Sequence, residues 1–209
     1  MNNVDLTVII PMYNEEEIIE RNISRVLSKL EEIVSEDSPQ QEGIQKSEKR
    51  PPSAQKVGRR LNWELILVND GSIDATAAIC RKIAENIPEV KLETYSPNRG
   101  RGYALRRGFA VSRGEYIITI DADLTYSPDH IETIWRELRK EEADFVLGSA
   151  YMKGGKTIGV PFKRLLVSRL GNWFLGLTFP GRIKTVTCVL RGYRREVIDS
   201  LELEADRKE

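Results

Sequence analysis

Two aspartates directly follow a strand-like run near the middle of the chain. In the segment YIITIDADLTYSP, residues 116–128, an apolar run ends at Ile120 and is followed by Asp121 and Asp123. Side chains two positions apart in an extended chain point to the same side, so these carboxylates repel each other unless they share a proton or a cation. Mg²⁺ and Mn²⁺ prefer oxygen ligands and often bridge carboxylates to substrate phosphates. The spacing therefore indicates a metal and diphosphate site, although ordinary turn aspartates are common.

Two more polar clusters follow strand-like runs. Tyr13, Asn14 and Glu15 come after the run 6–10, and Asp70 comes after the run 65–68. In parallel sheets, ligands bind outside the carboxyl ends of the strands. We therefore expect these clusters to meet Asp121 and Asp123 at one edge of a sheet.

A glycine-rich turn at residues 98–102 opens a predicted helix. A dinucleotide fingerprint would follow the first strand and would have Gly where this chain has Leu105, so a nicotinamide-dependent dehydrogenase is not expected. The glycine amides, with Arg99 or Arg101, could still approach a phosphate. A plain helix-start turn explains the same pattern.

Strands and helices alternate along the chain, which predicts an α/β fold with a mostly parallel sheet covered on both faces by helices. Asn14 is the expected N-cap of the first helix. Residues 35–60 have almost no aliphatic side chains and contain Pro51-Pro52, so we expect a flexible surface insertion there. The predicted strands are 6–10, 65–68, 90–95, 116–120 and 145–148.

The composition narrows the range of functions. The chain has 209 residues, enough for one domain, and its 32 basic and 32 acidic residues give no nucleic-acid footprint. A single histidine rules out His-pair zinc motifs, and two cysteines without metal-ligand spacing suit a reducing compartment. We expect neither a signal peptide nor a membrane span, because the polar N-terminus leads into a strand and no apolar stretch approaches about 18 residues.

Taken together, four motifs resemble the family 2 glycosyltransferases of the GT-A fold, a Rossmann-like nucleotide-diphospho-sugar transferase fold. The resemblance covers residues 6–193 apart from the insertion, and it is strongest to the dolichyl-phosphate or polyprenyl-phosphate mannose and glucose synthases. The motifs are Pro11-Met12-Tyr13-Asn14-Glu15, Val68-Asn69-Asp70-Gly71-Ser72, Asn98-Arg99-Gly100-Arg101-Gly102 and Asp121-Ala122-Asp123-Leu124.

The resemblance implies an inverting transfer of a hexose from a nucleotide sugar, of the GDP-mannose or UDP-glucose type, to a lipid phosphate at the cytosolic face of a membrane. It implies Mg²⁺ or Mn²⁺ at Asp121 and Asp123, and it gives catalytic roles to these two residues and Arg191. The donor-binding residues that it implies are Pro11, Tyr13, Asn14, Glu15, Asp70, Arg101, Asp121, Ala122 and Asp123.

An amphipathic helix predicted at residues 161–179 is the candidate acceptor element. Its polar stripe includes Arg164 and Ser168, which match an Arg-X-X-X-Ser pair that resembles an acceptor-phosphate clamp in the lipid-phosphate synthases. Basic and aromatic side chains also suit a membrane surface. A core-packing helix with a solvated polar side remains the alternative.

The chain departs from the family pattern at several positions. Ala150 stands where many members have Arg, with Lys153 and Lys156 as the candidate substitutes, and the segment before Arg191 lacks the usual Asp and Gly. We expect one catalytic domain over residues 1–209, truncated at its C-terminus. A sugar-hydroxyl acceptor, which would need a catalytic base, and a non-catalytic nucleotide-sugar or lipid-phosphate binding module remain alternatives.

Overall fold

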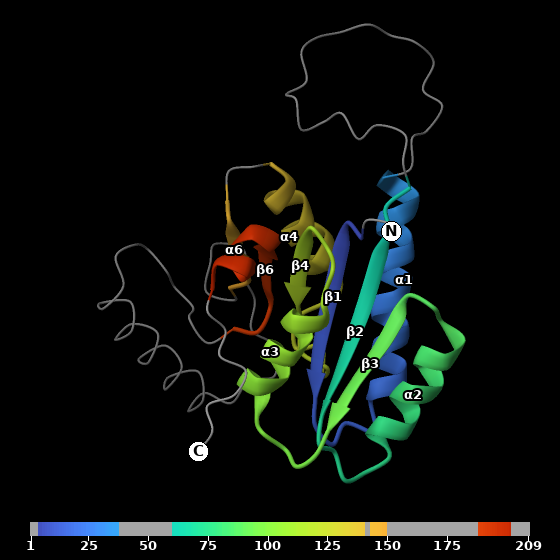
Figure 1. Ribbon diagram of the computed structural model, residues 1–209. Coiled ribbons are helices and arrows are strands. Elements are labelled where there is room, and N and C mark those ends of the chain that lie inside the picture. The colour runs from blue at the N-terminus through green and yellow to red at the C-terminus, as the bar shows by residue number, and fades with distance from the viewer. Residues whose placement is uncertain (1–3, 38–59, 141–142, 150–187, 202–209) are drawn as a thin grey trace, which may run out of the picture.

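The fold is a mixed, mostly parallel sheet between two layers of helices (Figure 1). The computed structural model describes residues 4–37, 60–140, 143–149 and 188–201. The strands are β1 (Leu6–Met12), β2 (Trp63–Asp70), β3 (Val90–Tyr95), β4 (Tyr116–Thr119), β5 (Phe145–Leu147) and β6 (Arg191–Arg194). The helices are α1 (Ile19–Asp37), α2 (Thr76–Asn86), α3 (Arg101–Val111), α4 (Asp129–Arg139) and α6 (Arg195–Ser200).

The six strands have the spatial order β3-β2-β1-β4-β6-β5. The first four are parallel, with Leu6 of β1 paired to Trp63 on one side and to Tyr116 on the other. β6 runs antiparallel to β4 and β5. The predicted strands are all present, and β6 is an addition, because the segment Arg191–Arg194 lacks the aliphatic run by which the other strands are recognised.

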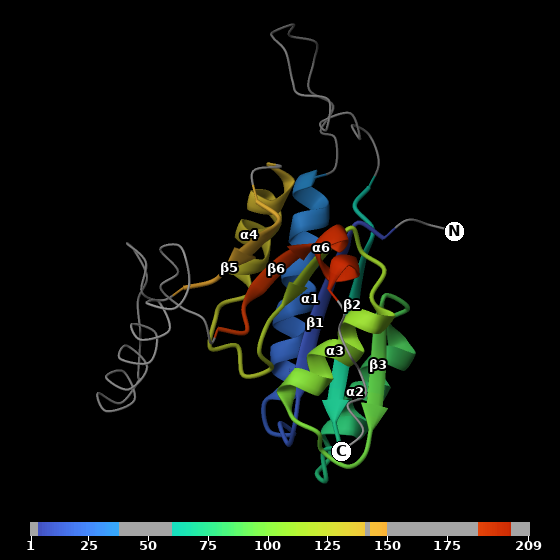
Figure 2. The ribbon, with the colours of Figure 1, turned by 60° about the vertical axis from the view of Figure 1, so that its left-hand side comes forward.

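Alternating side chains divide the core into two layers. Val8 and Ile10 of β1 pack with α1, α2 and α4, whereas Ile9 packs with α3 and α6 on the other face. In Figure 2, α3 and α6 lie in front of the sheet, and α1 and α4 lie behind it. This confirms the expectation of helices on both faces.

The helix α3 lies unusually close to the sheet. A Cβ added to Gly108 would lie 2.5 Å from Cγ2 of Ile9, so a larger residue there would push α3 away from β1. The first turn of α3 begins at Arg101, next to the carboxyl edge of the sheet.

Two local expectations at the ends of α1 are wrong. Asn14 does not cap α1, which begins at Ile19; its backbone is left-handed, with φ 54°, and its side-chain oxygen accepts a hydrogen bond from the amide of Ile73. The helix also runs to Asp37, beyond the predicted start of the insertion at residue 35. Residues 38–59 lie outside the described part of the chain.

Candidate functional site

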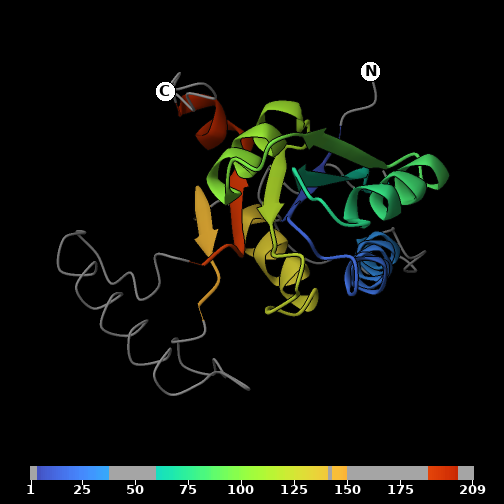
Figure 3. The ribbon, with the colours of Figure 1, turned by 90° about the horizontal axis from the view of Figure 1, so that it is seen from below.

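The predicted polar clusters gather where the parallel strands end. The carboxyl ends of β1, β2 and β3 all point to the lower edge in Figure 1, and Figure 3 looks onto that edge from below. The loop after β1 carries Tyr13 and Glu15, the end of β2 carries Asp70, and the turn after β4 carries Asp121 and Asp123. Parallel pairing of neighbouring strands brings these distant segments together.

Asp121 and Asp123 belong to a turn after β4, so the extended-chain geometry that would place their side chains on the same side does not apply. β4 ends at Thr119, and the amide of Leu124 donates a 3.1 Å hydrogen bond back to the carbonyl of Asp121. Both oxygens of Asp123 accept hydrogen bonds of 2.9 Å from Thr125, one from its amide and one from its hydroxyl. The turn therefore fixes the Asp123 carboxylate locally.

Burial and neighbouring negative charges raise the pKa of two carboxyl groups at this edge, those of Asp121 and Glu15. Burial and then the charge of Asp123 raise the pKa of Asp121, while Arg101 opposes the shift from 3.9 Å away. The pKa of Glu15 is raised by burial and then by the charges of Asp123, Asp74 and Asp121. Oxygen donors that repel one another in this way fit a hard divalent cation, which would remove the repulsion.

Asp70 connects the motif at residues 68–72 to the motif at residues 98–102. Its carboxylate is 3% exposed and accepts hydrogen bonds from the Arg99 amide at 2.8 Å and from the side-chain amide of Asn98 at 3.0 Å. Gly71 has φ 68°, and a Cβ there would lie 2.5 Å from the Asn98 nitrogen. The loop after β3 thus packs directly against the end of β2.

The loop after β1 is tied to the loop after β2 by hydrogen bonds that run in both directions. Glu16 Oε2 accepts from the Ala75 amide at 2.8 Å, while Asp74 Oδ2 accepts from the Glu16 amide at 3.2 Å. The buried Thr76 hydroxyl accepts from the Glu15 amide at 2.8 Å. The other bonds between these loops run from the Asn14 amide to Ser72 Oγ and from the Ile73 amide to Asn14 Oδ1.

The remaining predicted site residues differ in their surroundings. Pro11 is buried within β1 opposite Val68, whereas Tyr13 is 44% exposed at the sheet edge. Arg191 pairs with Thr119 at the end of β4, and its Nε donates a 2.6 Å hydrogen bond to the carbonyl of Cys188. Arg164 and Ser168 lie outside the described residues, as do Ala150, Lys153 and Lys156.

Sequence reasoning missed Asn22, a polar residue on the buried side of α1. Its side-chain amide donates a 2.9 Å hydrogen bond to the carbonyl of Ala122, between the two aspartates. The available signal was its position between Ile19 and Ile23, both buried. A polar side chain on an apolar helix face needs a buried partner.

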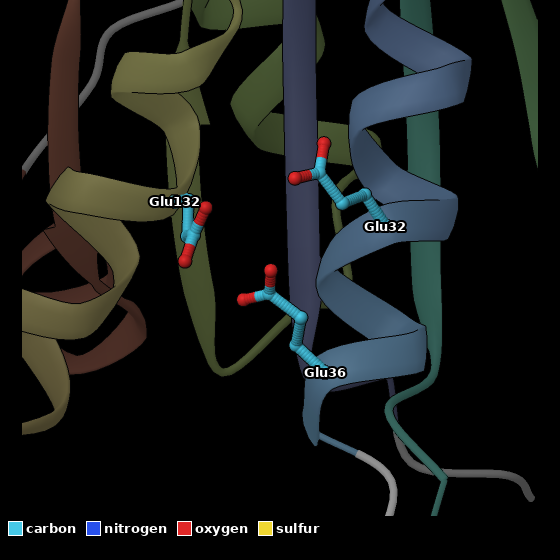
Figure 4. A group of neighbouring side chains, drawn as sticks. All are labelled: Glu32, Glu36 and Glu132. Carbon is cyan, nitrogen blue, oxygen red and sulfur yellow. The ribbon is translucent and has the colours of Figure 1, made fainter.

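A second group of carboxylates lies at the other end of α1. Figure 4 shows Glu32 and Glu36 of α1 facing Glu132 of α4. Lys29 lies 2.6 Å from Glu132, and Arg136 lies 2.7 Å from Glu132 and 2.8 Å from Glu36. Lys29 also lies 3.2 Å from Glu32. Each of the three glutamates thus has a cationic partner, so the group is an ion-pair network between α1 and α4.

A cavity of about 330 Å³ lies at the amino edge of the sheet, away from the aspartates. Two arginines of its lining already have partners: Arg113 lies 3.1 Å from the Glu64 carboxylate, and Arg195 donates to the carbonyl of Gly114. We therefore place the candidate site at the carboxyl edge, where the acidic groups are unbalanced.

A match to a known sequence family decides the classification. The model of the family described as glycosyl transferase family 2 matches residues 53–201. The chain belongs to this family.

Curated relatives of this glycosyltransferase share between a quarter and a third of its residues. It is 29% identical over 201 residues to a dolichol-phosphate mannosyltransferase of Pyrococcus furiosus, covering 95% of this chain and 48% of the relative. It is also 29% identical to a dolichyl-phosphate beta-glucosyltransferase of Trichomonas vaginalis, covering 93% and 53%. The chain spans about half the length of the curated relatives that it matches.

A solved structure shows the same fold. A mannosyltransferase of Pyrobaculum calidifontis, in complex with GDP-Man and Mn2+, superposes with a TM-score of 0.56 at 20% identity, covering 97% of this chain and 48% of the other. The expected GT-A fold is thereby confirmed. Within the described residues of the glycosyltransferase, we find no helix that combines the length and the apolarity needed to cross a bilayer.

Proposed function

We propose that this glycosyltransferase moves a hexose from a nucleotide-diphosphate sugar to a polyprenyl phosphate. The observation that carries the proposal is the convergence of Asp121, Asp123 and Glu15, with two raised pKa values, beside Arg101. Perturbed acidic groups at the carboxyl edge of a parallel sheet are typical of a ligand site.

Asp121 and Asp123 would hold a divalent cation, Mg²⁺ or Mn²⁺. When bound, the cation neutralises the diphosphate and makes it a better leaving group. Mn2+ is present in the structure of the Pyrobaculum mannosyltransferase, which supports a divalent metal here without choosing between the two ions. Oxygen donors alone suit both ions.

The other donor-binding residues surround this position. Arg101, 59% exposed at its side chain, is free to turn from Asp121 to a donor phosphate, and Asp70 with the loop after β1 would hold the nucleotide. We assign nucleotide contacts to Pro11, Tyr13, Asn14, Glu15 and Ala122 as the family resemblance implies, and a catalytic role to Arg191.

Two arguments support a polyprenyl phosphate as the acceptor: the names of the relatives and the ionisation of a phosphate monoester. The named relatives are dolichol-phosphate and dolichyl-phosphate transferases. In the proposed step an oxygen of the acceptor phosphate forms a bond to the sugar's anomeric carbon, while the bond from that carbon to the donor diphosphate breaks. A phosphate monoester is already anionic near neutral pH, since its second pKa is about 6, so the attack needs no strong general base.

Arg164 and Ser168 are proposed as the acceptor-phosphate clamp. A guanidinium and a hydroxyl can both donate to phosphate oxygens, and the charge-assisted bond is the stronger one. The acceptor is a lipid, so we propose that the protein works peripherally at the cytosolic face of a membrane.

The test is transfer of labelled hexose from GDP-mannose or UDP-glucose to a polyprenyl phosphate in detergent, with Mn²⁺ or Mg²⁺. We expect one donor to give lipid-extractable label that disappears with chelator and in Asp123→Asn. Transfer to a sugar hydroxyl and not to the lipid phosphate would contradict the acceptor proposal. Donor binding without any turnover would instead support a binding module.

A further inference from the structure

Asn22 is an amide buried on the apolar side of α1. It is 3% exposed, and its helical neighbours Ile19, Ile23 and Val26 are each no more than 1% exposed. Burying an amide without a partner is costly, by roughly 1–3 kcal/mol on mutational scales. An Asn at this position therefore destabilises the fold unless its amide is hydrogen-bonded.

The partner of Asn22 lies 100 residues further along the chain. Its Nδ2 donates a 2.9 Å hydrogen bond to the carbonyl of Ala122, which is itself 4% exposed. Water has little access to this bond, so it is stronger than a surface hydrogen bond. It connects the first helix directly to the turn between Asp121 and Asp123.

The turn needs such a connection because its backbone is strained. Leu124 has φ 50°, a left-handed conformation that is rare for a bulky residue and costs of order 1–3 kcal/mol. The hydrogen bonds from Leu124 to Asp121 and from Thr125 to Asp123 are all local. Strain of this kind persists only where surrounding structure over-determines the conformation, and the bond from Asn22 is a long-range restraint on it.

We propose that Asn22 is a positioning residue that holds the Asp121–Asp123 turn in the conformation needed for the metal and the donor diphosphate. This inference rests on the proposed function for its ligand and adds a residue that the motifs do not contain. Small displacements of ligating groups are expensive in metal sites, where loss of a supporting hydrogen bond typically costs 10–100-fold in affinity.

The test compares Asn22→Leu, which keeps the size of the side chain but removes the donor, with the wild-type chain. Mn²⁺ alone is titrated by electron paramagnetic resonance, and amide hydrogen exchange is followed at Leu124. We expect Mn²⁺ binding to weaken by about 10-fold and Leu124 exchange to accelerate by about 10-fold. Asn86→Leu is the matched control, because the Asn86 amide also donates to a carbonyl, that of Lys82, but on the exposed side of α2.

Hydrogen exchange separates positioning from general destabilisation. Faster exchange confined to residues 122–125 supports the proposal, whereas an equal acceleration across β1 would mean that Asn22 acts only on global stability. Asn22→Ser, a smaller change, is measured in the same way in case Asn22→Leu does not fold. Wild-type Mn²⁺ affinity and wild-type Leu124 exchange in a folded variant would overturn the proposal. A wild-type chain that binds no Mn²⁺ would overturn the metal assignment, while exchange at Leu124 would still decide the role of Asn22.

Discussion

The guanidinium of Arg101 lies 3.9 Å from the carboxylate of Asp121, across the carboxyl edge of the sheet. Arg101 belongs to the first turn of α3, and Asp121 follows β4, so the pair joins the start of a helix to the end of a strand. A divalent cation would bind the Asp121 carboxylate, and a donor phosphate would bind the Arg101 guanidinium. Each ligand would therefore replace this ion pair. The pair therefore links metal binding to donor binding.

Arg101→Ala should separate the two ligands. We expect nucleotide-sugar affinity to fall by about 10-fold, equivalent to about 1.4 kcal/mol, because a charged contact to the diphosphate is lost. Binding of Mn²⁺ alone should stay the same or tighten, since a nearby positive charge has been removed. Calorimetric titration measures both, with the exposed Arg81→Ala on α2 as the control.

If Arg101→Ala weakens the binding of Mn²⁺ and leaves the affinity for the nucleotide sugar unchanged, Arg101 supports the metal ligands and does not contact the donor. Equal loss of both, with a lower melting temperature, would indicate damage to α3 instead.

The second prediction concerns the metal-free protein. The raised pKa of Asp121 means that its ionisation opposes folding, so this penalty is absent below about pH 4, its unperturbed range, and grows as pH rises through the folded pKa. Asp121→Asn should therefore raise the melting temperature in chelator at neutral pH, by about 2–4 °C for each kcal/mol of penalty removed in a chain of this size. Mn²⁺ should stabilise the wild type and not this variant.

Thermal melts between pH 4 and 8, with chelator or Mn²⁺, measure this effect. A variant that melts below the wild type in chelator at every pH would show that Asp121 is a structural residue. The same melts on Asp123→Asn test whether the second carboxylate behaves alike.

The third prediction concerns the hydrogen-bonded loops after β1 and β2. Burial raises the pKa of Asp74, but the hydrogen bonds from the side chain and amide of Thr76 and from the amide of Glu16 outweigh it, so the pKa is lowered. Its contribution to stability is present above about pH 4 and is lost as pH falls through the lowered folded pKa. Asp74→Ala should cost about 1–2 kcal/mol and weaken donor binding, because the loop after β1 loses its hydrogen bond at the Glu16 amide.

Urea unfolding and nucleotide titration measure the two effects of Asp74→Ala. Asp199→Ala on α6 is the control, since this exposed carboxylate makes a long, 3.8 Å ion pair with Arg195. Unchanged donor affinity despite the lost stability would show that the loops are held together for folding alone.

Much of this architecture could be predicted because the sequence patterns are local. Aliphatic runs gave the strands of the parallel sheet, and the parallel order placed Asp70, Asp121 and Asp123 at one edge. β6 could not be predicted, because its Arg-Gly-Tyr-Arg sequence is stabilised by pairing with β4 and has no apolar run of its own. Tertiary pairing decides such a strand.

The contacts that support the site were harder to predict from the sequence than the motifs themselves. The bond from Asn22 to Ala122 joins residues 100 positions apart, and no spacing rule connects them. Asn14 was misread as a helix cap because the same side-chain chemistry serves a loop–loop hydrogen bond here. Residue types predicted which groups are present at the site, and three-dimensional contacts decided how they are held.

The fourth prediction concerns the ion-pair network of Figure 4. The hydrogen bond to Glu132 raises the pKa of Lys29 although burial opposes it, and the Lys29 side chain is only 8% exposed. Lys29→Met should destabilise the fold by about 3 kcal/mol, because it leaves partly buried carboxylates unbalanced. Lys140→Met is the control: its 2.6 Å pair with Glu137 is exposed and should cost under about 1 kcal/mol.

Urea unfolding compares the two lysine variants. A larger stabilisation by Mn²⁺ of Lys29→Met than of Lys140→Met would show that the three glutamates can hold a cation once Lys29 is gone. Equal costs for the two variants would mean that the network does not fasten α1 to α4.

The last prediction is that Arg164 serves the acceptor and not the donor. Arg164 and Ser168 are four residues apart in a segment predicted to be helical, so they would share one face, and a guanidinium beside a hydroxyl suits a phosphate. Arg164→Ala should reduce the use of polyprenyl phosphate by at least about 10-fold, or about 1.4 kcal/mol, with nucleotide affinity nearly unchanged. Arg164→Lys should rescue only part of the loss, since an ammonium cannot reproduce the planar fork of donors.

Acceptor-dependent transfer and separate donor titrations measure the two effects, and Arg169→Ala, five positions from Arg164, is the matched control. Weaker donor binding with normal acceptor kinetics in Arg164→Ala would instead place this arginine in the nucleotide site.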